Sequence, residues 1–200
     1  MPHVFQEKAS SLSSVSPSPR LAFEVIVLEV VRHLRVLDLG SGSGCMATLL
    51  ARLVEGRGHV LALEHIEELV QLAERNVAKH HQELVPEILE MRCQDGRSFD
   101  GFDGGDAFHL VHCGAALERV EDWLVALLIP GGRAVAPLGP TDAPQWLCSI
   151  DLLQDGSVEV TRHLRVLYVP MTSETHQRNR GEEWDEVVAR CVENSAHLTS

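Results

Sequence analysis

The chain has 200 residues, which is enough for one domain with a full hydrophobic core, and no internal repeat suggests a second. Its 17 lysines and arginines against 29 aspartates and glutamates give a formal net charge of −12, which argues against a nucleic-acid partner. No apolar run is long enough for a membrane span, and the first residues lack the regions of a signal peptide. We therefore expect a cytoplasmic protein without a membrane partner.

The chain begins with a segment rich in serine and proline. Residues 1–19 contain little to bury, so we expect them to form a flexible arm. Residues 21–33 are apolar and fit a helix or a strand. Ser18 as a capping residue and Pro19 in the first turn favour the helix.

Residues 36–44, Val-Leu-Asp-Leu-Gly-Ser-Gly-Ser-Gly, predict a buried strand that ends in an acid and turns through three glycines toward a helix. Glycine is needed because such a turn takes backbone angles closed to other residues and brings main-chain N–H groups close to a ligand. Residues 42–47 also satisfy the permissive G-x-G-x-x-A dinucleotide pattern. Asp38, two residues before the first glycine, is more typical of S-adenosylmethionine-dependent methyltransferases, because that ligand offers an ammonium to a carboxylate.

Two more acids follow strand patterns at positions where a nucleoside needs them. Glu64 comes after residues 59–63, about twenty residues beyond the glycines, where a carboxylate accepts hydrogen bonds from both ribose hydroxyls. Asp95 comes after residues 88–93, and in methyltransferases an Asp-Gly pair at this place reads the adenine amino group. In this order and spacing, Asp38, Glu64 and Asp95 together predict a nucleoside site.

The remaining pattern alternates helices and strands. Helices are expected at residues 46–54, 67–79 and 118–128, and strands at residues 108–113 and 133–135. Two further strands, at residues 145–153 and 158–169, are joined by an Asp-Gly turn and predict an antiparallel hairpin at one edge. The predicted fold class is therefore α/β, a doubly wound, mostly parallel sheet with an antiparallel edge hairpin, Rossmann-like as in class I S-adenosylmethionine-dependent methyltransferases.

The cysteines and histidines do not indicate thiol or metal chemistry. The five cysteines are widely spaced without a C-x-x-C pair, which predicts reduced thiols, and Cys93 and Cys113 are expected in the core. The eleven histidines lack metal-ligand spacing, and His109 and His112 fall on opposite faces of one strand. We predict no metal site.

Several motifs in residues 28–172 together resemble the protein-L-isoaspartate (D-aspartate) O-methyltransferases. The glycine motif is common to many methyltransferases. Two other motifs are much more specific to this family, His-x-Gly-Ala-Ala at residues 112–116 and Tyr-Val-Pro-Leu/Met-Thr at residues 168–172. In the family's order the chain also carries matches at residues 58–70, 95–97, 130–133, 137–140 and 155–157.

The resemblance implies a protein-repair reaction. S-adenosyl-L-methionine would be the cofactor and isoaspartyl-containing peptides and proteins the partners of a monomeric enzyme, which methylates the free α-carboxylate before the ester closes to a succinimide. A carboxylate with a pKa near 4 is already ionised at neutral pH, so positioning it in line with the methyl group is sufficient and no strong general base is required.

The resemblance also implies roles for particular residues. It assigns to the cofactor Asp38, Gly40, Ser41, Gly42, Ser43, Gly44, Glu64, His65, Asp95, Gly96 and Thr172. It assigns His112, Gly114 and Ala115 to the substrate, and Ser16 is the candidate for the family's active-site serine. A strand-end histidine bonded to the backbone is the alternative interpretation of His112, and a strand cap that of Thr172.

The chain also departs from the family pattern. The family's amino-terminal Thr-Ile-Ser-x-Pro-His signature is reduced to Ser-Val-Ser-Pro-Ser-Pro at residues 14–19, and His109 stands where an aspartate is usual. Three functional classes therefore stay open: an active isoaspartyl methyltransferase, an S-adenosylmethionine-binding adaptor without turnover, and a nicotinamide-dependent oxidoreductase. A methyltransferase for another acceptor would share the same core. We place the methyltransferase domain at residues 20–172, followed by an extension at residues 173–200 with a short helix near residues 182–192.

Overall fold

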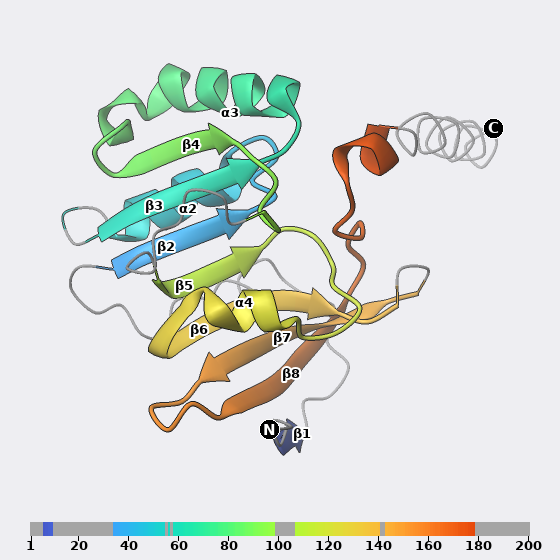
Figure 1. Cartoon of the computed structure of the whole chain (residues 1–200). Helices are drawn as coiled ribbons and strands as arrows, with labels where there is room; N and C mark the ends of the chain where they lie inside the picture. Colours follow the sequence, from blue (N-terminus) through green and yellow to red (C-terminus); the bar gives the residue numbers. More distant parts are fainter. Residues whose placement is uncertain are drawn as a thin grey trace, which may run out of the picture.

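The computed structural model describes residues 6–9, 34–54, 56, 58–98, 107–140 and 143–178. In this part of the chain, strands form one sheet in the order β1-β8-β7-β6-β5-β2-β3-β4, and helices pack on both of its faces (Figure 1). The prediction of a doubly wound, mostly parallel α/β sheet is therefore confirmed.

Five parallel strands form the half of the sheet on which the site is built. They are β2 (Leu34–Leu39), β3 (Gly58–Glu64), β4 (Leu89–Cys93), β5 (Phe108–Cys113) and β6 (Leu128–Leu138). The inner strands are nearly continuous apolar runs because both of their faces are covered. The strand order reverses between β2 and β5, and a ligand crevice is expected beyond the carboxyl ends of strands at such a switch point.

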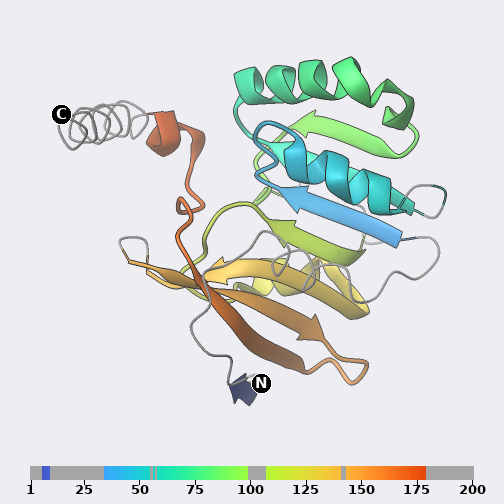
Figure 2. The same cartoon turned by 180° about the vertical axis from the view of Figure 1, so that it is seen from behind.

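Among the described residues, the helices that follow β2 and β3 cover one face of the sheet, and the helix that precedes β6 lies on the other (Figures 1 and 2). α2 (Cys45–Val54) and α3 (Glu67–His80) each match the predicted helix to within one residue at either end. α2 packs Leu50 and other apolar side chains into a core on its side of the sheet, and Leu124 of α4 belongs to the core on the opposite side.

α4 is much shorter than predicted, since it spans only Asp122–Ala126 where the sequence indicated a helix over residues 118–128. On one side of it, the N–H group of Leu117 donates to the carbonyl oxygen of Pro137 in β6 at 2.9 Å. On the other side, Leu128 already begins β6. Pairing of Leu117 with β6 on one side, and of Leu128 with β5 on the other, therefore outweighs helix propensity.

β7 (Gln145–Leu152) and β8 (Val158–Val166) form the predicted antiparallel hairpin. In its turn, the backbone N–H of Ser157 donates to the carboxylate of Asp155 at 2.9 Å. β8 is not the outermost strand, however, because β1 (Gln6–Ala9) pairs with it in parallel. These four residues were expected to belong to a flexible arm, and the backbone groups along the outer edge of β8 give them hydrogen-bond partners.

Three predicted features lie outside the described residues: Ser16, the helix over residues 21–33 and the helix near residues 182–192. Among the helices that the structure does describe, none is both long and apolar enough to span a bilayer.

Candidate active site

A cavity of about 220 Å³ lies beyond the carboxyl ends of β2, β3, β4 and β5, at the switch point of the sheet. Residues 169–172 and Gln177, from the chain after β8, complete its wall. The predicted site residues that line it are Gly40, Gly42, Glu64, His65, Asp95, Gly96, Gly114, Ala115 and Thr172. The fold therefore brings most of the predicted cofactor residues together around one space.

The glycine turn after β2 has the backbone angles closed to other residues that the sequence predicted. Gly40, Gly42 and Gly44 have φ values of +73°, +54° and +80°, a region that side chains other than glycine rarely adopt. The N–H groups of Gly40 and Ser41 both donate to the carbonyl oxygen of Leu63, at 2.9 and 3.1 Å. No atom lies within 4 Å of the place where a side chain of Gly42 would begin, so the turn leaves open space above it.

Glu64 is buried at the end of β3, and main-chain N–H groups hold its carboxylate in place. One oxygen accepts hydrogen bonds from His65 at 2.8 Å and Ile66 at 3.1 Å, and the other accepts one from Gly42 at 3.0 Å. Because each carboxylate oxygen has about two acceptor sites, the second oxygen keeps one for a ligand donor. Glu64 thus joins the glycine turn to the beginning of α3 and also lines the cavity.

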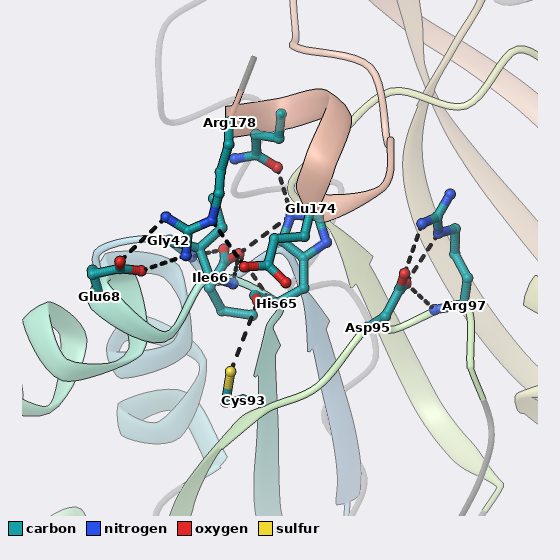
Figure 3. A network of polar contacts seen from close by, with 11 residues as sticks. Gly42, His65, Ile66, Glu68, Cys93, Asp95, Arg97, Glu174 and Arg178 are labelled. Carbon is teal, nitrogen blue, oxygen red and sulfur yellow. Dashed lines mark hydrogen bonds and ion pairs between the residues drawn. The ribbon is translucent and has the colours of Figure 1, made fainter. Parts of the chain in front are cut away.

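Asp95 follows β4 and carries an ion pair with Arg97 (Figure 3). The Arg97 backbone N–H and Nε both donate to Oδ1 at 3.0 Å, and Nη2 donates to Oδ2 at 2.6 Å. These bonds hold the pKa of Asp95 below its ordinary value, so the carboxylate remains an acceptor at neutral pH. At the neighbouring Gly96, a Cβ would lie 2.5 Å from Cδ2 of Leu39, so a larger residue there would force the Leu39 side chain to move.

The other predicted turn residues do not line the cavity and position the turn instead. A Cβ on Gly44 would lie 2.9 Å from Cβ of Ala73, so glycine allows α3 to approach the turn. The carbonyl oxygen of Ser43 accepts a hydrogen bond from Nδ2 of Asn76 in α3 at 3.0 Å. Ser41 is buried and is tied to β3 through its own N–H.

Asp38 and His112 form a buried pair behind the cavity. They are neighbours across β2 and β5, and Oδ1 of Asp38 lies 2.7 Å from Nδ1 of His112. Asp38 is fully buried, and its second oxygen has no hydrogen-bond partner among the described residues. Neither side chain lines the cavity, so a direct contact of Asp38 with a cofactor ammonium, or of His112 with substrate, stays a prediction.

The strap over residues 167–172, which follows β8, is anchored by a residue that the sequence analysis did not identify. Gln145 is completely buried, and its Nε2 donates to the carbonyl oxygens of Pro140 at 3.1 Å and Tyr168 at 3.4 Å. Its Oε1 accepts a hydrogen bond from the Tyr168 N–H at 2.9 Å. The strap also pairs with the chain after β5, since Met171 donates to the carbonyl of Ala116 at 2.8 Å.

The helical turn at residues 174–178, which carries Glu174 and Arg178 in Figure 3, also brings to the cavity a group that the sequence analysis did not identify. Oε1 of Gln177 lies 2.6 Å from Nε2 of His65, and both side chains line the cavity. Arg178 holds the carboxylate of Glu68, in the first turn of α3, through two hydrogen bonds of 3.2 and 2.8 Å. The Tyr-Val-Pro-Met-Thr motif, which ends at Thr172, was the nearest sequence signal.

Comparison with known proteins identifies the family. The sequence profile of the protein-L-isoaspartate(D-aspartate) O-methyltransferase family, PCMT, matches residues 6–176. The chain belongs to the PCMT family. It is 35% identical over 163 residues to a Caenorhabditis elegans protein-L-isoaspartate O-methyltransferase, a match that covers 80% of this chain and 70% of the relative. It is 37% identical over 150 residues to the Aeropyrum pernix enzyme of the same name, covering 75% of this chain and 54% of the relative.

The solved structures agree on the fold of this PCMT family member. A Plasmodium falciparum protein described as a protein-L-isoaspartate O-methyltransferase, in complex with S-adenosyl-L-homocysteine, superposes with a TM-score of 0.64. That match covers 82% of this chain and 78% of the other at 22% identity. This PCMT chain therefore has the Rossmann-like fold of S-adenosylmethionine-dependent methyltransferases. It spans from about half to about 70% of the length of the relatives that it matches.

A second hollow of about 520 Å³ adjoins the cavity in this PCMT structure. Residues 170–172 line both spaces, and Arg97, Trp123 and His176 line only the second one among the described cavities. Asp95 lines the cavity, whereas Arg97 lines the second hollow, so their ion pair stands between the two. The site thus consists of two adjacent spaces that share the wall formed by residues 170–172.

The two cysteines that the sequence analysis placed in the core, Cys93 and Cys113, are poor nucleophiles, because the pKa of each thiol is raised. The prediction that Cys113 is a core residue is confirmed, but the same prediction for Cys93 is wrong, because β4 is an edge strand and exposes its end. Partial desolvation of the thiol and the nearby carboxylate of Glu67 raise the pKa of Cys93 to about 11, so its thiolate is scarce at neutral pH. No group of three or more histidine, cysteine or acidic side chains suited to a metal occurs among the described residues.

Proposed function

We propose that this PCMT family member transfers a methyl group from S-adenosyl-L-methionine to the free α-carboxylate of isoaspartyl residues in damaged peptides and proteins. The observation that carries the proposal is the cavity at the switch point, where the glycine turn, Glu64 and Asp95 surround one space. Membership of the PCMT family supports this reaction class over nicotinamide chemistry.

The residues of the cavity fit the proposed cofactor. Ribose hydroxyls and an adenine amino group are hydrogen-bond donors, and both Glu64 and Asp95 are acceptors with remaining capacity. The open space above Gly42 accommodates the amino-acid end, because no Cβ occupies it. When bound, S-adenosylmethionine supplies an electrophilic methyl group on a positively charged sulfur. Thr172 lines both spaces, and we propose that it contacts the cofactor beside the acceptor.

The chemical step requires little from the protein beyond position and shielding from water. The acceptor carboxylate forms a new C–O bond while the C–S bond breaks and its electron pair goes to sulfur. A carboxylate and a sulfonium thereby become a neutral ester and a neutral thioether, and no proton moves. Leu39, Leu63 and Met171 give the cavity apolar walls, which strengthen the attraction between the opposite charges.

Other expectations from the sequence stay predictions. Ser16 as the active-site serine lies outside the described residues. The substrate roles of Gly114 and Ala115 are proposals supported by their place in the cavity wall. The cytoplasmic location, the monomeric state and the absence of nucleic-acid or membrane partners are likewise proposals.

Cofactor binding and turnover test the proposal in turn. S-adenosylhomocysteine is expected to raise the thermal unfolding temperature of the chain and NAD is not, since only a ligand of the folded state stabilises it. Methyl transfer to an isoaspartyl peptide then separates an enzyme from an adaptor that binds the cofactor without turnover. Stabilisation by NAD alone would instead favour an oxidoreductase, and transfer to small carboxylates alone would favour a different acceptor.

A further inference from the structure

The charges around the two adjacent spaces do not favour an anionic acceptor. Glu64, Asp95, Glu118 and Glu121 all line one space or the other, in a chain with a formal net charge of −12. An acceptor carboxylate that enters this surrounding is repelled unless a cation faces it. Arg97 is the one lysine or arginine among the described residues that line either space.

The guanidinium of Arg97 has capacity for a second anion. It carries five N–H groups, and two of them, on Nε and Nη2, donate to Asp95. The remaining three belong to a side chain that lines the second hollow. Its ion pair with Asp95 also raises the pKa of Arg97 above its ordinary value, so it stays charged at any working pH.

We propose that Arg97 binds the acceptor carboxylate in the second hollow and orients it toward the cofactor cavity. This inference rests on the proposed function and names the residue that recognises the substrate. One carboxylate oxygen accepts from the guanidinium, which leaves the other oxygen to form the bond to the methyl group. Planar guanidinium groups suit this task because their N–H groups point in fixed directions.

The position of Arg97 also connects acceptor and cofactor. Asp95, the proposed partner of the adenine amino group, holds the guanidinium by two hydrogen bonds and by a third from the Arg97 backbone. Loss of the Asp95 carboxylate therefore frees the Arg97 side chain, even though Asp95 itself lines the cofactor cavity and not the second hollow. Asp95→Asn is expected to weaken acceptor binding as well as cofactor binding.

Steady-state kinetics with an isoaspartyl peptide tests the proposal. At saturating S-adenosylmethionine, Arg97→Met is expected to raise the KM for the peptide by about tenfold to a hundredfold, as the loss of a charge-assisted hydrogen bond implies. Arg97→Lys keeps the positive charge but not the planar guanidinium group, and its KM is expected to fall between those of wild type and Arg97→Met. Arg75→Met removes one positive charge from the exposed surface of α3 and is the matched control, expected to behave as wild type.

A binding comparison isolates recognition of the carboxylate. The protein saturated with S-adenosylhomocysteine is titrated with the isoaspartyl peptide and with the same peptide whose α-carboxylate is a carboxamide. Wild type is expected to prefer the carboxylate, and Arg97→Met to lose this preference while its melting temperature stays near that of Arg75→Met. An unchanged preference and an unchanged KM in Arg97→Met would overturn the inference and leave the proposed function intact. Failure of wild type to bind or methylate either peptide would overturn both.

Discussion

Replacing Gln145 by alanine removes the buried anchor of the strap that lines both spaces. The native side chain makes three hydrogen bonds, to Pro140 and twice to the backbone of Tyr168. Gln145 is completely buried, so alanine leaves an unfilled space there and removes the partner of the Pro140 and Tyr168 backbone groups. An unsatisfied buried group costs about 1–3 kcal/mol, so the variant is expected to lose roughly 2–4 kcal/mol of unfolding free energy, or to release the strap at a smaller cost.

Urea unfolding and calorimetric titration with S-adenosylhomocysteine distinguish these outcomes. Whether the variant loses stability or releases the strap, we expect weaker cofactor binding, because residues 168–172 no longer keep their place in the wall of the cavity. Gln154→Ala is the matched control, since Gln154 is exposed and its amide donates one hydrogen bond, to Pro130. A Gln145→Ala variant that matches this control in both stability and affinity would refute the assigned role of the anchor.

Three further predictions concern the cavity and the sheet. Gly42→Ala forces a φ of +54° on alanine, so we expect urea unfolding to show a loss of about 1–2 kcal/mol, together with weaker S-adenosylhomocysteine binding. Unchanged affinity would contradict the proposal that the ligand occupies the open space above Gly42. Glu64→Gln replaces an acceptor of three N–H groups by an amide with one oxygen, and calorimetry is expected to show at least about tenfold weaker binding of the same ligand. His163 has a lowered pKa because of burial and nearby Arg133, so the unfolded chain binds its proton more readily and stability falls as pH drops below about 6.5. His163→Gln is expected to flatten this decline, and an identical pH dependence in both proteins would refute the assignment.

The parts of the site that follow from local sequence were predictable. The positive φ values of the glycine turn and the acids at the ends of β3 and β4 depend on one strand and the residues directly after it. Glu64 and Asp95 therefore reach the cavity as expected, because parallel strands end at the same edge of the sheet. The hairpin of β7 and β8 was also set locally, by its Asp-Gly turn.

The parts that depend on strand register and edge position were not predictable. Asp38 bonds to His112 because β2 and β5 pair in one particular register, which brings together residues 74 positions apart. Cys93 is exposed because β4 lies at the edge of the sheet, a place that the pattern of one strand does not reveal. Gln145 carries no motif, and its role follows only from the contact between the start of β7 and the strap.

The Asp38 and His112 pair illustrates how a motif residue can serve the site indirectly. Asp38 lies two residues before the first glycine of the turn, and a fully buried carboxylate needs a hydrogen-bonded partner to be tolerated. His112 supplies this partner. Two residues after it, Gly114 approaches Gly40 so closely that a Cβ on Gly114 would lie 2.5 Å from the Gly40 backbone oxygen. The pair therefore joins the two strand ends that form the floor of the switch point.

The most direct test of the account is transfer of labelled methyl from S-adenosylmethionine to an isoaspartyl peptide, with the normal aspartyl peptide of the same sequence beside it. The account predicts base-labile label on the isoaspartyl peptide alone, and a rate that Glu64→Gln reduces strongly. Tight binding of S-adenosylhomocysteine without any label on the peptide would contradict it, because the cavity would then hold the cofactor without serving this reaction.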